Sequence, residues 1–157
     1  MKFLRNDLIE YGAPDARTIR LLWLHPKEPV GFAIDTNAQE AEPELVQLEA
    51  LESELRSGNS KLLTIDPSLT VLEETSVSAK HKAKRDSAWQ IVGSLLRAEP
   101  EIYYPNHRAK RVAECVIAGM ASRPTIYKYL RRYWQRGQTP NALLPDFSNS
   151  GAKGKVR

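Results

Sequence analysis

The chain has 157 residues, which is enough for one domain or two small ones. Its 23 Lys and Arg against 19 Asp and Glu give a formal net charge of +4, but the charge is unevenly divided. Residues 1–75 hold 7 basic and 14 acidic side chains (net −7), and residues 76–157 hold 16 and 5 (net +11). A basic half of this kind is the electrostatic footprint expected of a nucleic-acid-binding protein.

The composition excludes several other classes. A single cysteine, Cys115, excludes an intramolecular disulfide, and we expect it to be a structural thiol rather than a nucleophile. The three histidines are scattered and lack carboxylate or cysteine partners at ligand spacing, so no metal or other cofactor is expected. No apolar run approaches the roughly 20 residues of a membrane span, and no secretory signal opens the chain. We therefore expect a cytoplasmic protein with no membrane contact.

The first third of the chain is typical of β structure. In residues 18–24, Ile19, Leu21 and Trp23 alternate with the residues between them, as in a half-buried strand. Strands are expected over residues 8–11, 18–24 and 30–34, with turns at 12–15 and 25–29. Three short antiparallel strands need a helix or further strands over their apolar face.

A helix with leucines at helical spacing is predicted next, from Pro43 to Gly58-Asn59. Residues 62–65 offer a last short strand, so residues 1–75 are predicted to form a small β-rich, α+β or barrel-like module. The outer face of the helix is acidic, with Glu42, Glu44, Glu49, Glu52 and Glu54. This charge argues against contact with a phosphate backbone, and the helix is either a structural support or a protein-contact surface.

Residues 68–79 are rich in Ser, Thr and Glu and are predicted to be a linker. A helix over residues 80–98 follows, with Trp89, Val92 and Leu96 on a broad apolar face. Its first turns carry a basic cluster of Lys80, Lys82, Lys84 and Arg85. These cations either contact DNA or only keep the start of the helix soluble.

The segment from Pro105 to Gly137 predicts two helices joined by a tight turn. Apolar residues recur through the first helix at positions i, i+3, i+4, i+7 and i+8, and Pro105 suits its first turn. Gly119 follows the last apolar position, where a chain leaving a helix often needs positive φ. Ser122 is placed to cap the second helix. A turn of about three or four residues containing Gly is the spacing of a helix-turn-helix motif.

The second of these helices has two different faces. Ile126, Leu130, Tyr133 and Trp134 form an apolar face, and long cationic and amide side chains lie opposite. An α-helix fits the major groove of B-DNA, where Arg, Lys and Gln reach base edges and phosphates. The alternative is a solvated basic face on an ordinary three-helix bundle. The candidate DNA-binding residues are Arg123, Thr125, Tyr127, Lys128, Arg131, Arg132, Gln135, Arg136 and Gln138.

Within this set we assign Arg131 to base contact, because it lies near the centre of the outward face, and Arg132 to phosphate contact. After Gly137 no periodic pattern remains, and residues 138–157 are predicted to be an extended basic arm. Lys153 and Lys155 are its candidate DNA contacts. The arm is either a DNA-binding strand or a simple tail. The predicted fold is α+β: a small β-rich module (1–75) with one acidic helix, an all-α three-helix helix-turn-helix domain (76–137) and the arm (138–157).

The run PTIYKYLRRYWQRGQTPNALLPDFSNSGA, residues 124–152, resembles the N-terminal DNA-binding region of TnsB-type transposases. This family serves heteromeric bacterial cut-and-paste transposons and is related to the retroviral integrases. The resemblance implies binding to repeated double-stranded DNA sites at transposon ends, with other transposition proteins and other copies of the chain as partners. It also implies a nucleoid-associated bacterial protein.

In the family, catalysis belongs to an RNase H-like domain that follows this region. The chain stops at Arg157, so we expect a transposase portion without DNA-cutting activity of its own. Two other interpretations stay open. One is a free-standing helix-turn-helix transcriptional regulator. The other is a protein–protein adaptor whose basic half provides solubility and does not bind DNA.

Overall fold

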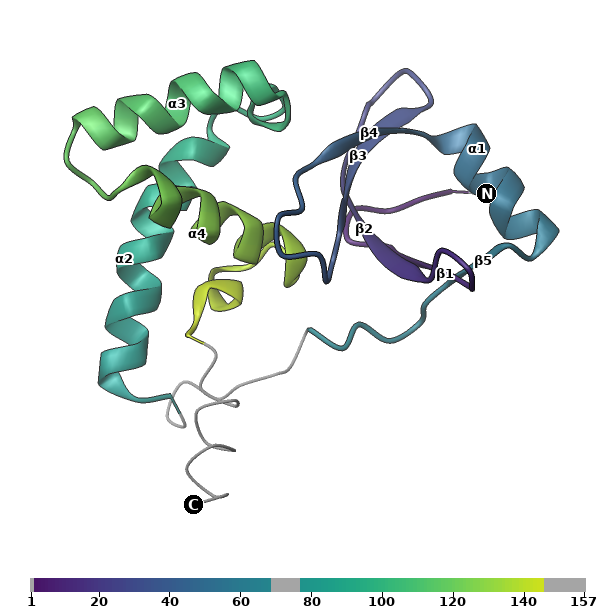
Figure 1. Ribbon diagram of the computed structural model, residues 1–157, viewed down its shortest axis with the longest axis horizontal. Coiled ribbons are helices and arrows are strands. Elements are labelled where there is room, and N and C mark those ends of the chain that lie inside the picture. Colours follow the sequence, from purple (N-terminus) through teal and green to yellow (C-terminus); the bar gives the residue numbers. More distant parts are fainter. Residues whose placement is uncertain (1, 69–76, 146–157) are drawn as a thin grey trace.

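The computed structural model describes residues 2–68 and 77–145 and has the predicted α+β architecture (Figure 1). Residues 2–68 contain an antiparallel sheet and one helix and are called the sheet part below. Residues 77–145 are helical and are called the helical part. The predicted linker over residues 68–79 falls mostly outside the described residues.

The sheet has five strands in the order β4-β3-β2-β1-β5, and every neighbouring pair is antiparallel. Its register pairs Ile9 with Ile19 and Leu21 with Ala33, and an irregularity follows between Leu21 and Trp23. The strands are β1 (Leu8–Tyr11), β2 (Arg17–Leu24), β3 (Val30–Asp35), β4 (Glu44–Gln47) and β5 (Ser60–Leu62).

The leucine-spaced helix starts later than its pattern predicts. Residues 44–47 form the edge strand β4, which pairs with β3 from Val30↔Gln47 to Ala33↔Glu44. Helix α1 therefore runs only over Leu48–Ser57, and Gly58 closes it with a φ of 86°. The last strand is also displaced from the predicted 62–65, because Ser60–Leu62 pair with β1. Pairing with a neighbouring strand sets where β4 ends and where β5 begins, and the spacing of apolar residues along the sequence does not indicate that pairing.

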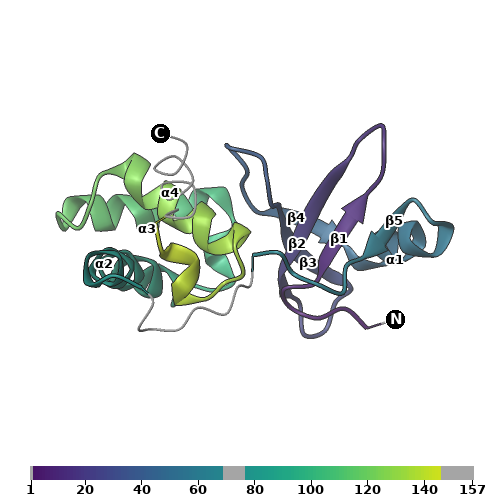
Figure 2. The same ribbon diagram turned by 90° about the horizontal axis from the view of Figure 1, so that it is seen from below.

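Both faces of the sheet are covered. Leu21 and Ala33 point to one face, where they pack with Leu51 of α1. Leu22, Phe32 and Ile34 point to the other face and join the core of the helical part. Figure 2 shows α1 on the side of the sheet that is remote from the helices. The prediction of a half-buried β2 was therefore wrong, because the helical part covers the face that the alternation assigns to solvent.

The helical part is built from three longer helices and two short 3-10 turns. Ser78 caps α2 by accepting a hydrogen bond from the His81 amide at 3.1 Å. The core of the helical part contains Val92, Ile102, Ile126 and Leu130, all fully buried. The elements are α2 (Ala79–Leu96), η2 (Glu101–Tyr103), α3 (Pro105–Ile117), α4 (Arg123–Gln135) and η3 (Pro140–Leu143).

Aromatic packing joins the two parts. The rings of Phe32 on β3 and Tyr103 in η2 stack with centroids 5.1 Å apart. The Tyr103 ring in turn lies 5.7 Å from that of Trp134 on α4. Burial, with further contributions from Glu99, raises the pKa of Tyr103 far above its ordinary value, so its hydroxyl stays protonated. The hydrophobic core is thus continuous from the sheet into α4.

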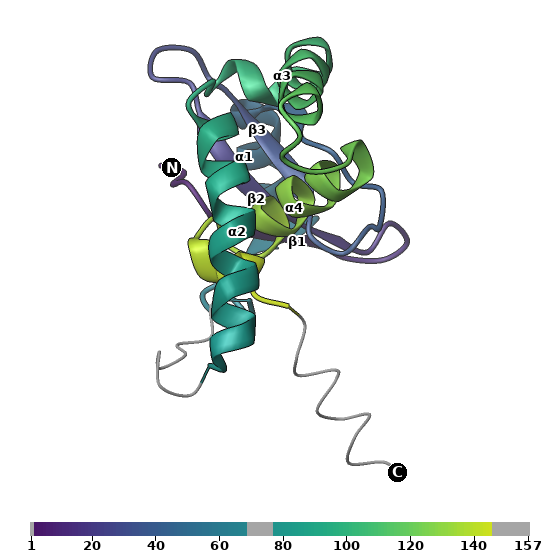
Figure 3. The same ribbon diagram turned by 90° about the vertical axis from the view of Figure 1, so that its left-hand side faces the viewer.

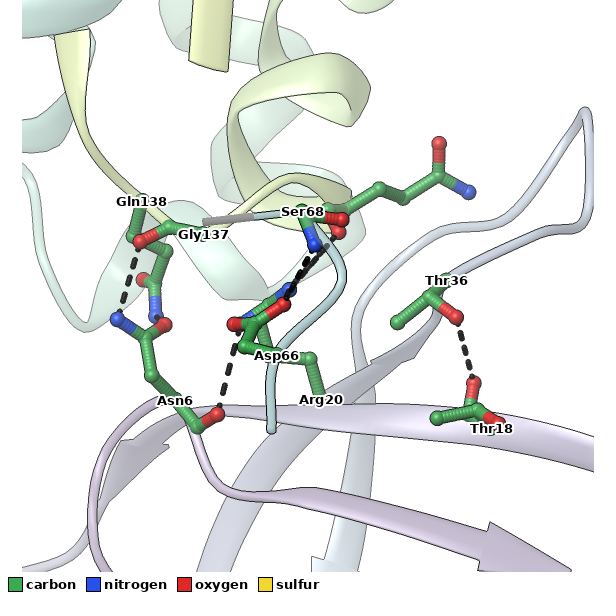
Figure 4. Close-up of polar contacts among 9 residues, drawn as sticks. Asn6, Thr18, Arg20, Thr36, Asp66, Ser68, Gly137 and Gln138 are labelled. Atoms are coloured by element: carbon green, nitrogen blue, oxygen red, sulfur yellow. Dashed lines mark hydrogen bonds and ion pairs between the residues drawn. The ribbon is translucent and has the colours of Figure 1, made fainter. Parts of the chain in front are cut away.

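A buried ion pair accompanies this packing (Figure 4). The Arg20 side chain on β2 is fully buried and donates to both carboxylate oxygens of Asp66, at 2.5 and 3.0 Å. It also donates to the carbonyl of Gln135 at the end of α4, at 3.3 and 3.4 Å. Asn6 adds a side-chain hydrogen bond to the carbonyl of Gly137, at 3.0 Å. The C-terminal end of α4 is therefore tied to the sheet by polar contacts as well as by apolar ones.

The prediction of an extended arm from residue 138 onward was wrong for its first part. Residues 140–143 form η3, and Ala142, Leu143 and Leu144 are buried against the helices. The Arg85 guanidinium of α2 holds this segment through a 2.8 Å bond to the side-chain oxygen of Asn141. Two adjacent leucines after a proline bury apolar surface without needing a periodic pattern, so no helical or strand spacing indicates this burial. Residues 146–157 lie outside the described residues.

Candidate nucleic-acid interface

Helix α4 has a fixed inner face. Ser122 caps it as predicted, accepting the Thr125 amide at 3.4 Å and donating its own hydroxyl hydrogen to the Thr125 oxygen at 2.9 Å. The residues before the cap, 118–121, make the turn from α3, with Gly119 at a φ of 74°. The predicted apolar face is confirmed, because Ile126, Leu130, Tyr133 and Trp134 are all buried. The orientation of α4 about its own axis is thereby set by packing.

The open side of α4 carries two exposed cations near its N-terminal end. Arg123 and Lys128 are exposed, and neither has a hydrogen-bond or ion-pair partner among the described residues. Tyr127 and Thr125 are half-buried beside them. Lys128 is two residues from both Ile126 and Leu130, so at about 100° per residue it lies near the centre of the outward face, opposite the buried residues, whereas Arg123 begins the helix. This end of the helix is free to meet a ligand.

The sheet part covers one flank of α4. The Arg131 guanidinium donates to the carbonyl of Ala41 at 3.0 Å. The Gln135 amide donates to the carbonyls of Asp35 and Ala38, at 2.9 and 2.8 Å. Ala38 and Ala41 belong to the β3–β4 loop (residues 36–43), and Asp35 is the last residue of β3. Two residues predicted to face DNA are therefore engaged within the chain, by partners about 90 to 100 positions away in sequence.

The β3–β4 loop makes this flank acidic. Glu40 is 94% exposed and lies 3.9 Å from Arg131. Glu42 accepts a hydrogen bond from Arg108 of α3 at 2.7 Å, and 56% of its side chain is exposed. Carboxylates in these positions repel a phosphate backbone. The flank that holds Arg131 and Gln135 is thus a poor surface for nucleic acid.

The other flank of α4 is basic. A groove of about 480 Å³ runs between α2 and α4, and Lys84, Lys128 and Arg132 all line it. Figure 3 shows α2 and α4 crossing, with the segment after α4 beside α2. The sequence places Lys84 in a basic cluster without indicating that it lies beside α4. Ser87, which also lines the groove, was missed. Its position one helical turn after Lys84 was the available signal.

The remaining candidates are distributed differently. Arg136 is half-buried at the C-terminal cap of α4. Gln138 adopts a φ of 58°, and its side chain donates to the side-chain oxygen of Asn6 at 2.7 Å, so it belongs to the contact with the sheet part (Figure 4). Lys153 and Lys155 lie outside the described residues.

The described residues hold no group of three or more His, Cys, Asp or Glu side chains placed to bind a metal ion. Within residues 2–68 and 77–145, none of the helices combines the length and the apolarity that a membrane crossing requires. Cys115 is buried and unpaired on α3.

Comparison with known proteins bears on the same region. Residues 85–147 match the family described as the TnsB second domain, a span that begins in α2 and continues beyond η3. Over 127 residues the chain is 36% identical to the transposon Tn7 transposition protein TnsB of Escherichia coli. That alignment covers 80% of the chain but only 17% of TnsB. Because residues 76–157 number 82, the aligned stretch extends well into the sheet part.

Proposed function

This chain belongs with the TnsB-type transposases, to whose N-terminal region it corresponds, and we propose that it binds double-stranded DNA at the ends of a transposon. In this proposal α3 and α4 act as a helix-turn-helix and α4 enters the major groove. The main support is the exposure of Lys128 on the outward face of a helix whose inner face is buried, with Arg123 exposed at the first position of the same helix. Exposed cations at the N-terminal end of a recognition helix are suited to base edges and phosphates.

The proposed DNA-contacting residues of α4 lie on its open side. Arg123, Lys128 and Arg132 supply charge, and Tyr127 and Thr125 lie next to them. Lys153 and Lys155 remain predictions for the segment after Pro145. Arg136, at the end of the helix, is a backbone contact in this proposal.

Arg131 and Gln135 take a different role. We propose that they position α4 rather than read bases, because the Arg131 Nε–H and the Gln135 amide donate to carbonyls of the sheet part. Losing either contact weakens the attachment of the C-terminal half of α4 to the sheet part, which then rests on the Arg20 contact and the apolar core. Displacement of a recognition helix weakens binding to all sequences together, whereas loss of one base contact relaxes specificity at one position.

The chain spans under a fifth of the length of the TnsB protein it matches, so the activity of a whole transposase is not assigned to it. We propose that this portion recognises the DNA and that strand cleavage and joining are performed elsewhere in such a transposase. Its partners would be the repeated sites at transposon ends, neighbouring copies of the chain on the same DNA, and other transposition proteins. The working location would be the bacterial nucleoid.

The test is a binding measurement on the full chain. Fluorescence anisotropy would compare a duplex from the end of the transposon that encodes the chain, a promoter duplex and a scrambled duplex. We expect tighter binding to the end duplex and a steep decrease of affinity with salt, at about 0.9 per neutralised phosphate on a double-logarithmic plot. Equal affinity for all three duplexes would refute end recognition, and a flat salt dependence would favour the adaptor interpretation. Preference for the promoter would favour the regulator.

A further inference from the structure

The groove between α2 and α4 is open to solvent and lies beside the proposed recognition helix. It measures about 480 Å³. Its walls carry Lys84 and Ser87 from α2 and Lys128 and Arg132 from α4. The rest of the lining is formed by Ala83 of α2, Tyr129 of α4, and Leu143 and Pro145 from η3 and the residues after it. The two helices are far apart in the sequence, and both contribute cationic or hydroxyl side chains to the same groove.

The spacing on each helix accounts for this convergence. Lys84 and Ser87 are one turn apart on α2, and Lys128 and Arg132 are one turn apart on α4. Each pair therefore forms a short row along its helix, and the two rows border the same groove. Lys84 and Lys128 are exposed and have no hydrogen-bond or ion-pair partner among the described residues. Their charge is not neutralised by any described carboxylate.

The floor of the groove is held in place. Leu143 is 2% exposed and belongs to the main core of the helical part. The Arg85–Asn141 hydrogen bond fixes η3 to α2 at 2.8 Å. The groove is therefore formed by packed elements before any ligand arrives, and a ligand need not create it.

The two flanks of α4 differ in charge. Lys84 and Arg132 lie on the groove side, whereas Glu40 and Glu42 lie on the side of the β3–β4 loop. A polyanion approaching α4 is attracted to the first flank and repelled from the second. This asymmetry selects one direction of approach and argues for an extended anion rather than a neutral peptide in the groove.

We propose that this groove receives the sugar-phosphate backbone of one DNA strand while α4 lies in the adjacent major groove. Helix α2 is then a second DNA-binding element, with Lys84 as a phosphate contact and Ser87 as a hydrogen-bond donor to the same strand. The inference rests on the proposed DNA binding and extends it to α2. It also gives the basic cluster at the start of α2 a function beyond solubility.

The experiment measures binding of the full chain to the end duplex across a salt series. Lys84→Ala is compared with Lys27→Ala, which removes the same charge from an exposed turn of the sheet part. Each lost phosphate contact should lower the salt slope by about 0.9, which corresponds to about eightfold weaker binding at 0.1 M salt. We expect this change for Lys84→Ala on both end and scrambled duplexes, and none for Lys27→Ala. Lys84→Arg should retain the parental slope.

Thermal unfolding of each variant excludes a trivial explanation, since an exposed and unpartnered lysine should not alter the midpoint. If Lys84→Ala and Lys27→Ala change the slope equally, the effect is net charge alone and the groove inference is overturned. It is also overturned if the parent binds with a steep slope that Lys84→Ala leaves unchanged. A parent chain that binds no duplex would instead refute the proposed function, and this inference with it.

Discussion

Removal of the Asp66 carboxylate should strongly destabilise the chain. Asp66 accepts two hydrogen bonds from Arg20, whose side chain is fully buried between β2 and the end of α4. Asp66→Ala leaves that guanidinium with only carbonyl partners, those of Gln135 and Asn6, at 3.3 to 3.4 Å. Removing one partner of a buried ion pair costs about 3–5 kcal/mol. Because 15% of the Asp66 side chain is exposed to solvent, we expect a cost at the lower end of this range, about 3 kcal/mol.

The assay is urea unfolding followed by tryptophan fluorescence and far-UV circular dichroism. Trp23 reports on the sheet part and Trp134 on the helical part, so one experiment follows both. The matched control is Asp15→Ala, at an exposed turn position, which should stay within about 0.5 kcal/mol of the parent. If Asp66→Ala behaves like this control, the pair does not stabilise the contact between the two parts.

A second variant tests whether the loss of stability in Asp66→Ala comes from the buried Arg20 charge that is left without its carboxylate partner. Arg20→Met combined with Asp66→Ala removes both charges, and it should recover part of the stability lost in Asp66→Ala alone. The two carbonyls that Arg20 satisfies lose their donor, so recovery should be incomplete. A double variant less stable than Asp66→Ala by the full cost of Arg20→Met would mean that the two residues are not coupled.

The same pair makes stability depend on acid. Burial raises the pKa of Asp66, but hydrogen bonds from Arg20 and the Ser68 amide outweigh it and hold the pKa below its ordinary value of 3.8. Because the folded-state pKa is depressed, the stabilisation is complete above the unfolded-state pKa and is lost as the pH falls through the folded-state value. The parent and Asp66→Ala should therefore approach each other in stability below about pH 4. A constant difference down to pH 2 would contradict this.

Four further predictions concern α4 and the segment after it. Trp134→Ala should lose DNA binding together with about 3–5 kcal/mol of stability, and a variant that melts like the parent but fails to bind would move Trp134 into the interface. Leu143→Ala should cost about 2–5 kcal/mol, because the side chain is 2% exposed; an unchanged unfolding midpoint would mean that η3 is not part of the core. Lys128→Ala should weaken DNA binding without altering the unfolding curve, and equal affinity would remove it from the interface. Arg131→Ala should weaken binding to end and scrambled duplexes alike, and relaxed specificity at one base pair would restore it as a base contact.

Local patterns predicted most elements because each has a periodic signal. The alternation in residues 18–24 identified β2, and the spacing of Ile126, Leu130 and Tyr133 identified the inner face of α4. Ser122 and Gly119 marked the turn between α3 and α4 correctly. These signals involve neighbours within a few positions, so a single sequence contains them.

Contacts between distant residues could not be predicted in this way. Arg20 in an alternating strand is typical of a solvent-facing position, and its partners lie 46 and 115 residues away. Arg131 and Gln135 have the composition of DNA contacts, yet their acceptors are backbone carbonyls of a loop, which leave no trace in residue identity. Helical periodicity tells which face of α4 is outward, but not that the sheet part covers one flank of it.

The covered flank also changes how the division of charge should be tested. Separate halves would each expose the core shared by Phe32 and Tyr103, so loss of binding by either half would be ambiguous. The predicted boundary between residues 75 and 76, and the prediction that the basic half carries the DNA affinity, are better tested by substitutions in the full chain.

An amide chemical-shift titration of the full chain with the transposon-end duplex would test directly whether α4 contacts the DNA. We expect the largest shifts in residues 123–132 of α4 and 84–87 of α2, with little change in β1 and β5. A scrambled duplex at low salt should affect the same surface with smaller shifts. Shifts confined to the sheet part, or a titration in which α4 does not respond, would contradict the assignment of α4 as the recognition helix.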